Sequence, residues 1–256
     1  MNKVENPFAG DILSGFRVLV CGASKGIGRA TAEMLVAAGA DVIGVSRGEA
    51  GIAGATSLQL DLEDTEAVKA AVSELLAEGP IHILINNSGG PPGGPLLSNE
   101  VADFEAPFAR HLHAAHTITQ LLVPGMEAAG IGRIVNIIST SVREPIENIG
   151  LSNTLRGAMA AWSKSLSREL PACITINNIL PGFTNTGRLS SLADSISERT
   201  GKDPKEVKEN WLSQVPINRL IDPTETAAAI TFLCLPSSGG IRGISLAVDG
   251  GRMRSI

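Results

Sequence analysis

Short apolar runs rich in β-branched residues alternate along this chain with longer segments of helical periodicity. Such alternation predicts a doubly wound parallel sheet of about seven strands with helices on both faces. Ligands of these sheets bind at the carboxyl ends of the strands, where the strand order reverses. The expected strands are 17–21, 41–45, 58–60, 81–85, 133–138, 174–180 and 244–248. The expected helices are 26–38, 64–77, 101–126 with a bend near Pro107, 152–170, 189–215 and 224–234.

Composition limits the functional classes. No linker-like stretch divides the 256 residues, so residues 1–256 are expected to form one domain. The net charge of −5 argues against a nucleic-acid surface, and the absence of an apolar run of 18 residues argues against a membrane span. The three cysteines, Cys21, Cys173 and Cys234, are interpreted as free thiols, which fits a cytoplasmic location.

A glycine-rich turn, Gly22-Ala23-Ser24-Lys25-Gly26-Ile27-Gly28, stands between the first expected strand and helix. Glycines allow the backbone to approach a pyrophosphate, and the helix N-terminus behind the turn supplies unpaired N–H groups. The alternative is a tight strand–helix turn that only needs small residues. The strand before and the helix after the turn favour dinucleotide binding.

Further motifs occur in order along nearly the whole chain: Asp61-Leu62, Asn86-Asn87-Ser88-Gly89, Gly132 to Ser139, Asn177 to Gly182 with Thr186, and Val248 to Gly251. Together with the glycine turn, they resemble the short-chain dehydrogenase/reductase family, especially its ketoacyl-reductase-like branch. The resemblance implies a single-domain Rossmann-type fold. It also implies cofactor contacts from Gly22, Ser24, Lys25, Gly26, Ile27, Gly28, Asp61, Leu62, Asn87, Ser88, Gly89, Arg156, Pro181, Gly182, Thr184 and Thr186.

The end of the second expected strand indicates which nicotinamide cofactor is preferred. An acidic residue there binds the adenosine ribose of NAD, but this chain has Ser46 followed by Arg47. Lys25 adds a second positive charge in the glycine turn. Two cations suit a 2′-phosphate, so NADP(H) is expected rather than NAD(H). The alternative is that both cations are ordinary solvated surface charges.

The chain contains no tyrosine, although the resemblance implies a tyrosine as proton donor. Of the four polar residues that the resemblance places in the active site, Ser139 matches the serine. The tyrosine position falls on Ser152, the lysine position on Arg156 and the asparagine position on His111. Three of the four positions therefore differ from the family pattern.

These replacements change the acid–base chemistry available. The hydroxyl of Ser152 is a far weaker acid than a tyrosine, and Arg156 stays protonated, so it can stabilise an oxyanion but relays protons poorly. His111 has a side chain suited to proton transfer, and packing is the equally weighted alternative. His113 and His116 are interpreted as packing or subunit-interface residues. No metal site is expected, because no acidic or cysteine ligand is adjacent.

Four hypotheses follow. The first is an NADP(H)-dependent oxidoreductase acting on a small-molecule carbonyl or alcohol, with an altered proton path through Ser139, Ser152, Arg156 and His111. The second is a catalytically weakened NADP-binding sensor or partner protein. The third is a non-redox enzyme on the same scaffold, and the fourth an isomerase or dehydratase using bound nicotinamide. The first is preferred, because the cofactor motifs and Ser139 are retained.

Two segments are expected to border the substrate. Residues 187–216 stand where the family places a helical substrate lid, and their mixture of apolar and charged residues predicts amphipathic helices. The Gly/Pro-rich loop 89–95 follows the fourth expected strand, so it should line the ligand crevice. The resemblance also implies a homotetramer or a homodimer.

Overall fold

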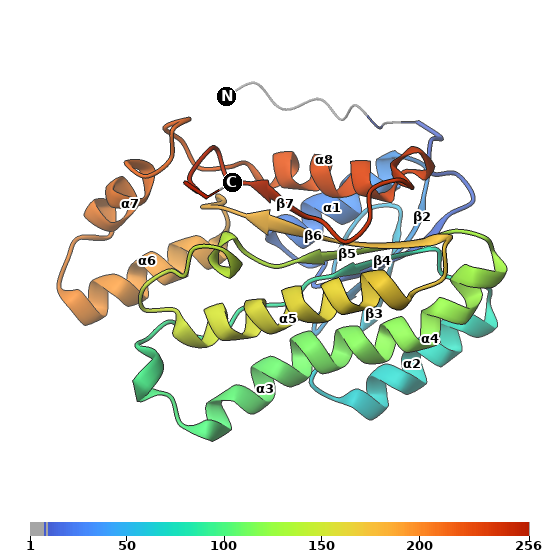
Figure 1. Cartoon of the computed structure of the whole chain (residues 1–256), viewed down its shortest axis with the longest axis horizontal. Coiled ribbons are helices and arrows are strands. Elements are labelled where there is room, and N and C mark those ends of the chain that lie inside the picture. The colour runs from blue at the N-terminus through green and yellow to red at the C-terminus, as the bar shows by residue number, and fades with distance from the viewer. Residues whose placement is uncertain (1–7, 9, 256) are drawn as a thin grey trace.

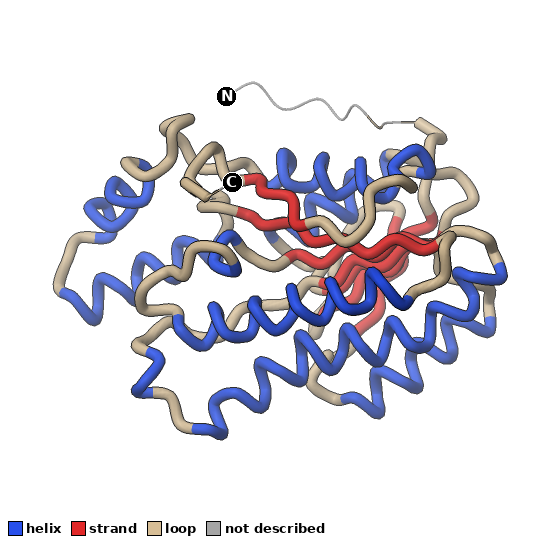
Figure 2. Tube along the Cα trace, viewed as in Figure 1, coloured by secondary structure: helices blue, strands red, loops and turns tan. Residues whose placement is uncertain are grey.

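The computed structural model describes residues 8 and 10–255, which form a seven-stranded parallel sheet of order β3-β2-β1-β4-β5-β6-β7. The order reverses between β1 and β4, so the predicted doubly wound fold is confirmed, and the crevice lies at the carboxyl ends of these two strands. Figure 2 shows the strands gathered in the centre with helices around them. The strands are β1 Arg17–Cys21, β2 Asp41–Ser46, β3 Ala55–Gln59, β4 Ile83–Asn86, β5 Gly132–Ile137, β6 Ile174–Pro181 and β7 Ser245–Val248.

Helices cover both faces of the sheet (Figure 1). The pair α1 and α8 packs on one face, and α2, α4 and α5 lie on the other. Two further helices, α6 and α7, follow β6 and extend beyond the carboxyl end of the sheet. The bounds are α1 Gly26–Ala37, α2 Thr65–Ala77, α3 Glu105–Phe108, α4 Ala114–Ala128, α5 Gly150–Glu169, α6 Gly187–Thr200, α7 Pro204–Leu212 and α8 Pro223–Cys234. Within residues 8 and 10–255, no helix could span a membrane.

Three local predictions from the sequence need correction. The strand expected at 58–60 is β3 at Ala55–Gln59, an edge strand whose largely solvent-facing side chains lack an apolar run. The long helix is interrupted at Ala109–His113 by a π-helical turn and not at Pro107, which lies in the first turn of α3, where proline is tolerated. The helical segment expected at 189–215 is divided into two helices, α6 and α7, because Gly201 at φ +71° ends α6.

A row of buried amides crosses the middle of the sheet. Asn86, Asn136 and Asn178 are in register on β4, β5 and β6, and Asn178 is in register with Ser245 on β7. Asn86 donates to Asn136 at 2.8 Å, Asn136 to Asn178 at 2.9 Å, and Asn178 to Ser245 Oγ at 3.1 Å. A buried amide without a hydrogen-bond partner lowers the stability of the folded protein. This amide ladder of Asn86, Asn136 and Asn178 therefore favours one strand register beside the crevice.

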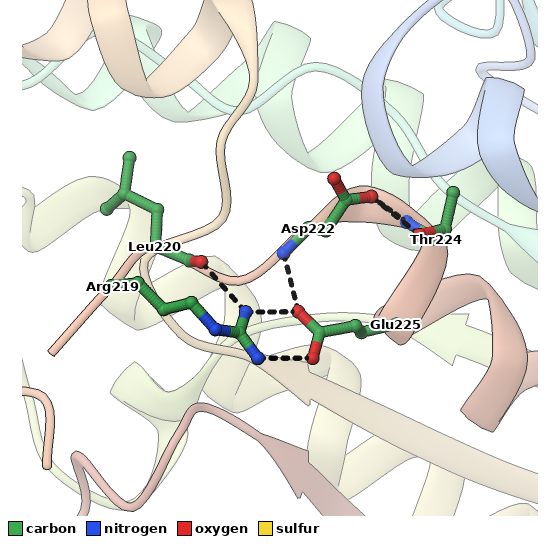
Figure 3. Close-up of polar contacts among 5 residues, drawn as sticks. All are labelled: Arg219, Leu220, Asp222, Thr224 and Glu225. Carbon is green, nitrogen blue, oxygen red and sulfur yellow. Dashed lines mark hydrogen bonds and ion pairs between the residues drawn. The ribbon is translucent and has the colours of Figure 1, made fainter. Parts of the chain in front are cut away.

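Side chains at and just before the start of α8 satisfy the backbone N–H groups of this helix terminus (Figure 3). Asp222 caps the helix by accepting from Thr224 N at 2.9 Å, and Glu225 accepts from Asp222 N at 2.8 Å. Arg219 donates to both carboxylate oxygens of Glu225 at 2.6 and 2.8 Å. The helix terminus and the cation thus both have carboxylate partners.

All three cysteines in the described part of the chain are free, as predicted. Cys21 and Cys234 are buried, and burial raises the pKa of each thiol to about 12. They are therefore packing residues and not nucleophiles.

Candidate active site

The glycine turn has the geometry that the sequence predicts. Gly22 and Gly26 have φ angles of +62° and +59°, which favour glycine. A Cβ on Gly28 would lie 2.2 Å from the carbonyl oxygen of Gly22 and 2.6 Å from Asn87 Nδ2. Asn87 donates to that same carbonyl at 3.2 Å, so the end of β4 is fastened to the turn.

The helix behind the turn begins without a cap. Lys25 is the N-cap residue of α1, no side chain accepts a hydrogen bond there, and the first turn contains no acidic residue. Side chains cap four other helices, namely α2, α6, α7 and α8, through Asp64, Thr186, Asp203 and Asp222, whereas α5 also begins without a side-chain cap. Free N–H groups at the positive end of a helix suit a phosphate, so this site fits a dinucleotide.

The other predicted cofactor segment, Pro181 to Thr186, faces the turn. The methyl carbon of Thr186 lies 3.3 Å from where a Cβ on Gly26 would be. Thr186 also caps α6, and Thr184 donates to Gly182 O at 3.2 Å. The structure therefore places Thr186 beside the glycine turn, although the two lie far apart in the sequence.

The residues predicted to select NADP lie beside the end of β2. Ser46 is buried and donates to Gly48 O at 2.6 Å, while Arg47 and Lys25 are exposed. Within residues 8 and 10–255, neither cation forms an ion pair. Asp61 is exposed just before α2, and the preference for NADP remains a prediction.

Arg156 is the central cation of the candidate site. It lies on α5, is only 8% exposed, and donates through Nη1 to Ile137 O at 2.9 Å. That same Nη1 lies 3.4 Å from Nδ1 of His111. Burial, followed by the nearby charge of Arg188, lowers the pKa of Arg156 to about 10, so the side chain remains a cation at neutral pH.

The hydrogen bonds of His111 determine its tautomer. Nε2 lies 3.1 Å from Gly89 O, which can only accept, so Nε2 carries the proton. Nδ1 therefore accepts from Ser88 Oγ at 2.8 Å and faces Arg156. Burial and the charge of Arg156 hold the pKa of His111 well below its usual value, so the ring is neutral at neutral pH. Sequence reasoning could not supply this environment.

The two predicted serines are held differently. Ser139 follows β5, and its Oγ accepts from Ser141 N at 3.1 Å, which leaves its own proton available for donation. Ser152 stands one helical turn before Arg156 on α5, so the two side chains share one side of the helix. Both serines are partly exposed.

A cavity of about 10 Å³ lies beside Arg156 and His111, roughly the space that one water molecule needs. Asn86, Asn87, Ser88 and Leu62 contribute to its wall. Polar groups on several sides suit a bound water.

Two arginines near this site were missed by the sequence reasoning. Arg110 lies on the π-helical turn next to His111 and pairs with Glu63 at 3.0 Å. Arg188 lies in the first turn of α6 and donates to Pro91 O in the Gly/Pro-rich loop. The available signals were the position of Arg110 next to His111 and that of Arg188 two residues after Thr186.

Comparison with known proteins agrees with this geometry. A family described as enoyl-(acyl carrier protein) reductase matches residues 22–252. The 3-oxoacyl-[acyl-carrier-protein] reductase FabG of Vibrio harveyi is 33% identical over 251 residues, covering 93% of this chain and 98% of that protein. The chain belongs to the short-chain dehydrogenase/reductase family.

Other relatives act on sugars. Human L-xylulose reductase is 32% identical over 248 residues, covering 93% of this chain and 97% of that protein. The structure of L-sorbose reductase from Gluconobacter frateurii, complexed with NADPH and L-sorbose, superposes with a TM-score of 0.88 at 27% identity, over 96% of this chain and all of that one. A similar fold and family membership therefore accompany several substrates.

Proposed function

We propose that this short-chain dehydrogenase/reductase is an NADP(H)-dependent oxidoreductase that transfers hydride between nicotinamide and a carbonyl or alcohol substrate. The observation that carries the proposal is the uncapped start of α1 behind an intact glycine turn, facing Thr186. Several relatives, including the L-sorbose reductase crystallised with NADPH, are reductases. When bound, the cofactor supplies the hydride, and the protein orients and polarises the substrate.

The rest of the proposal concerns the proton. The Oγ of Ser139 accepts from Ser141 N, so its proton is free for the substrate oxygen. The buried charge of Arg156 stabilises negative charge developing on that oxygen. A proton then comes from water, with Ser152 as a relay one turn along α5. This arrangement needs no side chain with the acidity of tyrosine.

His111 has a positioning role in this scheme. Its Nε2–H donates a hydrogen bond to Gly89 O, and its Nδ1 faces Ser88 and Arg156. Neutral His111 therefore has no N–H available to protonate the substrate. It joins the loop after β4 to the guanidinium that polarises the substrate. His111→Gln is therefore expected to raise KM and lower kcat modestly, without moving an ionisation in the pH profile between pH 6 and 8.

The experiment is NADPH oxidation against a panel of ketones, keto acids, ketoses and β-ketoacyl thioesters, with NADP-dependent alcohol oxidation as the reverse assay. Turnover on at least one compound supports the proposal. A comparison of Ser152→Ala with His111→Gln then locates the relay. A rate unaffected by Ser152→Ala but abolished by His111→Gln would contradict the assigned roles.

A substitution of Arg47 tests the preference for NADP(H) over NAD(H). Arg47→Asp places a carboxylate where a 2′-phosphate would bind, so we expect the NADPH affinity to fall about tenfold or more relative to NADH. Fluorescence titration of both cofactors measures the ratio. An unchanged ratio would make Arg47 a solvated surface charge.

The second candidate is a catalytically weakened NADP-binding sensor. It is favoured by the absence of tyrosine from the whole chain and by the neutral, fully engaged His111. NADPH binding without turnover on any compound in the panel, in either direction, would select it.

A further inference from the structure

The candidate site holds more positive charge than its own residues neutralise. Arg110, Arg156 and Arg188 come from the π-helical turn, α5 and α6, and they influence one another electrostatically. Arg110 has a carboxylate partner in Glu63. Within residues 8 and 10–255, Arg156 and Arg188 form no ion pair, although Arg156 is almost fully buried. Buried charges are normally paired, so this part of the site is suited to bind an anion.

The two guanidinium groups without a carboxylate partner lie beside the same residue, Gly90. A methyl group on Gly90 would lie 3.6 Å from Arg188 Nη2 and 3.8 Å from Arg156 Nη2. Each arginine donates a hydrogen bond to one backbone carbonyl, Arg156 to Ile137 O and Arg188 to Pro91 O, and these bonds orient the two side chains. In both cases most of the guanidinium donors stay free, which suits a forked acceptor such as a carboxylate.

The place of Arg188 in its helix supports a binding role. It stands in the first turn of α6, where the helix dipole disfavours a cation, and no acidic residue in that turn compensates. The loop that it contacts is packed against the lid, since a Cβ on Gly93 would lie 3.2 Å from Leu192. Arg188 therefore connects the lid with the loop that borders Arg156.

We propose that Arg156 and Arg188 bind a carboxylate on the substrate, so that the substrate is a small keto acid or hydroxy acid. This inference rests on the proposed function for the reaction itself. In the reduction, hydride reaches the carbonyl carbon, a proton reaches its oxygen, and the carboxylate is unchanged. The carboxylate binds both guanidinium groups and holds the lid helix over the site.

The test pairs each keto acid with its methyl ester. In the wild-type protein, kcat/KM should favour 2-oxo or 3-oxo acids over their esters. Arg188→Gln should reduce this preference at least about tenfold, as expected for losing a hydrogen bond to a charged group. The matched control is Arg199→Gln, an exposed arginine on the same helix, which should leave the preference unchanged. Equal losses of kcat/KM for acid and ester would mean that Arg188 only holds the lid in place, and would overturn the proposal.

A second measurement separates this inference from the proposed function. Calorimetry on the NADP-bound protein compares oxamate with its uncharged counterpart oxamide, and the NADPH affinity of Arg188→Gln is measured alongside. Binding of oxamate that Arg188→Gln weakens supports the carboxylate site even if no compound turns over. No oxamate binding by the wild type would overturn it. So would a loss of NADPH affinity with unchanged oxamate binding, because the anion would then belong to the cofactor.

Discussion

The starts of α1 and α8 contrast sharply, although both helices pack on the same face of the sheet. At α8, Asp222 and Glu225 satisfy the backbone N–H groups, and Arg219 pairs with Glu225. At α1, no side chain caps the helix and no acid stands in its first turn. The positive potential is thus compensated at the start of α8 and uncompensated at the start of α1, where the glycine turn borders the crevice and a ligand's anion is expected.

The same contrast holds for arginines. Arg219 has a bidentate carboxylate partner, whereas Arg156 and Arg188, beside the crevice, have no carboxylate partner among the described residues. The uncapped α1 terminus and the free guanidinium groups lie at the carboxyl end of one sheet. We therefore expect the dinucleotide to bind at the start of α1 and the substrate to bind beside Arg156 and Arg188.

The largest effect should come from closing the α1 terminus. Gly28→Ala would place a methyl group 2.2 Å from Gly22 O, and relief of that clash must displace the turn. We expect NADPH affinity to fall more than about 100-fold, with lower thermal stability, since overpacking costs roughly 1–3 kcal/mol. Fluorescence titration and thermal unfolding provide the two readouts.

The control for this variant lies on the other side of the sheet. Gly157→Ala in α5 meets no atom within 4 Å, so it should leave NADPH affinity unchanged and raise helix stability by about 1 kcal/mol. Full NADPH affinity in Gly28→Ala would break the claim that the turn holds the cofactor.

The second-largest effect is expected from the amide ladder that crosses β4, β5 and β6. Asn136→Ala removes the partner of both Asn86 and Asn178, and leaves two buried amides unsatisfied. The free energy of unfolding should fall by about 2–4 kcal/mol, measured by urea denaturation. Asn210→Ala, an exposed position, serves as the control and should stay within about 0.5 kcal/mol of the wild type. A loss in Asn136→Ala no larger than the control would mean that the ladder does not stabilise the sheet.

A pH effect of intermediate size follows from His111. The lowered pKa of this buried histidine means that the unfolded chain binds a proton that the folded protein excludes. Its contribution to stability is therefore complete above the unfolded pKa near 6.5. It is lost as the pH falls below that value, by up to about 1.4 kcal/mol per pH unit.

Urea denaturation between pH 5 and 8 measures this slope in the wild type and in His111→Gln. The glutamine variant should lose the component below pH 6.5, and His113→Gln, at an exposed position on the same π-helical turn, should keep it. Identical slopes in all three proteins would show that His111 is not held neutral.

The smallest effect is expected at the compensated terminus. Glu225→Gln keeps an acceptor for Asp222 N but loses the ion pair with Arg219, which is partly solvent-exposed. Tm should fall by no more than about 2 °C. Hydrogen bonding to Arg219 lowers the pKa of Glu225, so this contribution is present above the carboxyl's usual pKa and is lost as the pH falls through the lower, folded value. A larger fall in Tm, or any change in NADPH affinity, would break the distinction between the two helix termini.

Much of the fold was predictable, because its signals are local. Alternating apolar and helical segments predict the parallel sheet, and the glycine turn predicts where a dinucleotide would enter. The bounds predicted for β3 were wrong because this exposed edge strand is largely polar and lacks the apolar run that indicates the other strands. The π-helical turn at Ala109–His113 has no sequence signature of the strength of a proline or a glycine.

The candidate site was only partly predictable, for a different reason. Ser152 and Arg156 are four residues apart on one helix, so their proximity follows from helical spacing. The approach of Arg188 to Pro91 joins residues 97 positions apart, and the contact of His111 with Arg156 joins residues 45 apart. The tautomer of His111 depends on Gly89 O, and its lowered pKa depends on burial and on Arg156; the sequence alone does not place these neighbours.

The most direct test of the central claim is isotope transfer from NADPH deuterated at the nicotinamide C4 position. The protein is incubated with this cofactor and the carbonyl panel under single-turnover conditions, and the products are analysed by mass spectrometry. The account predicts deuterium on the former carbonyl carbon of at least one product, transferred by a chain without tyrosine. Tight NADPH binding with no deuterium in any product would contradict it.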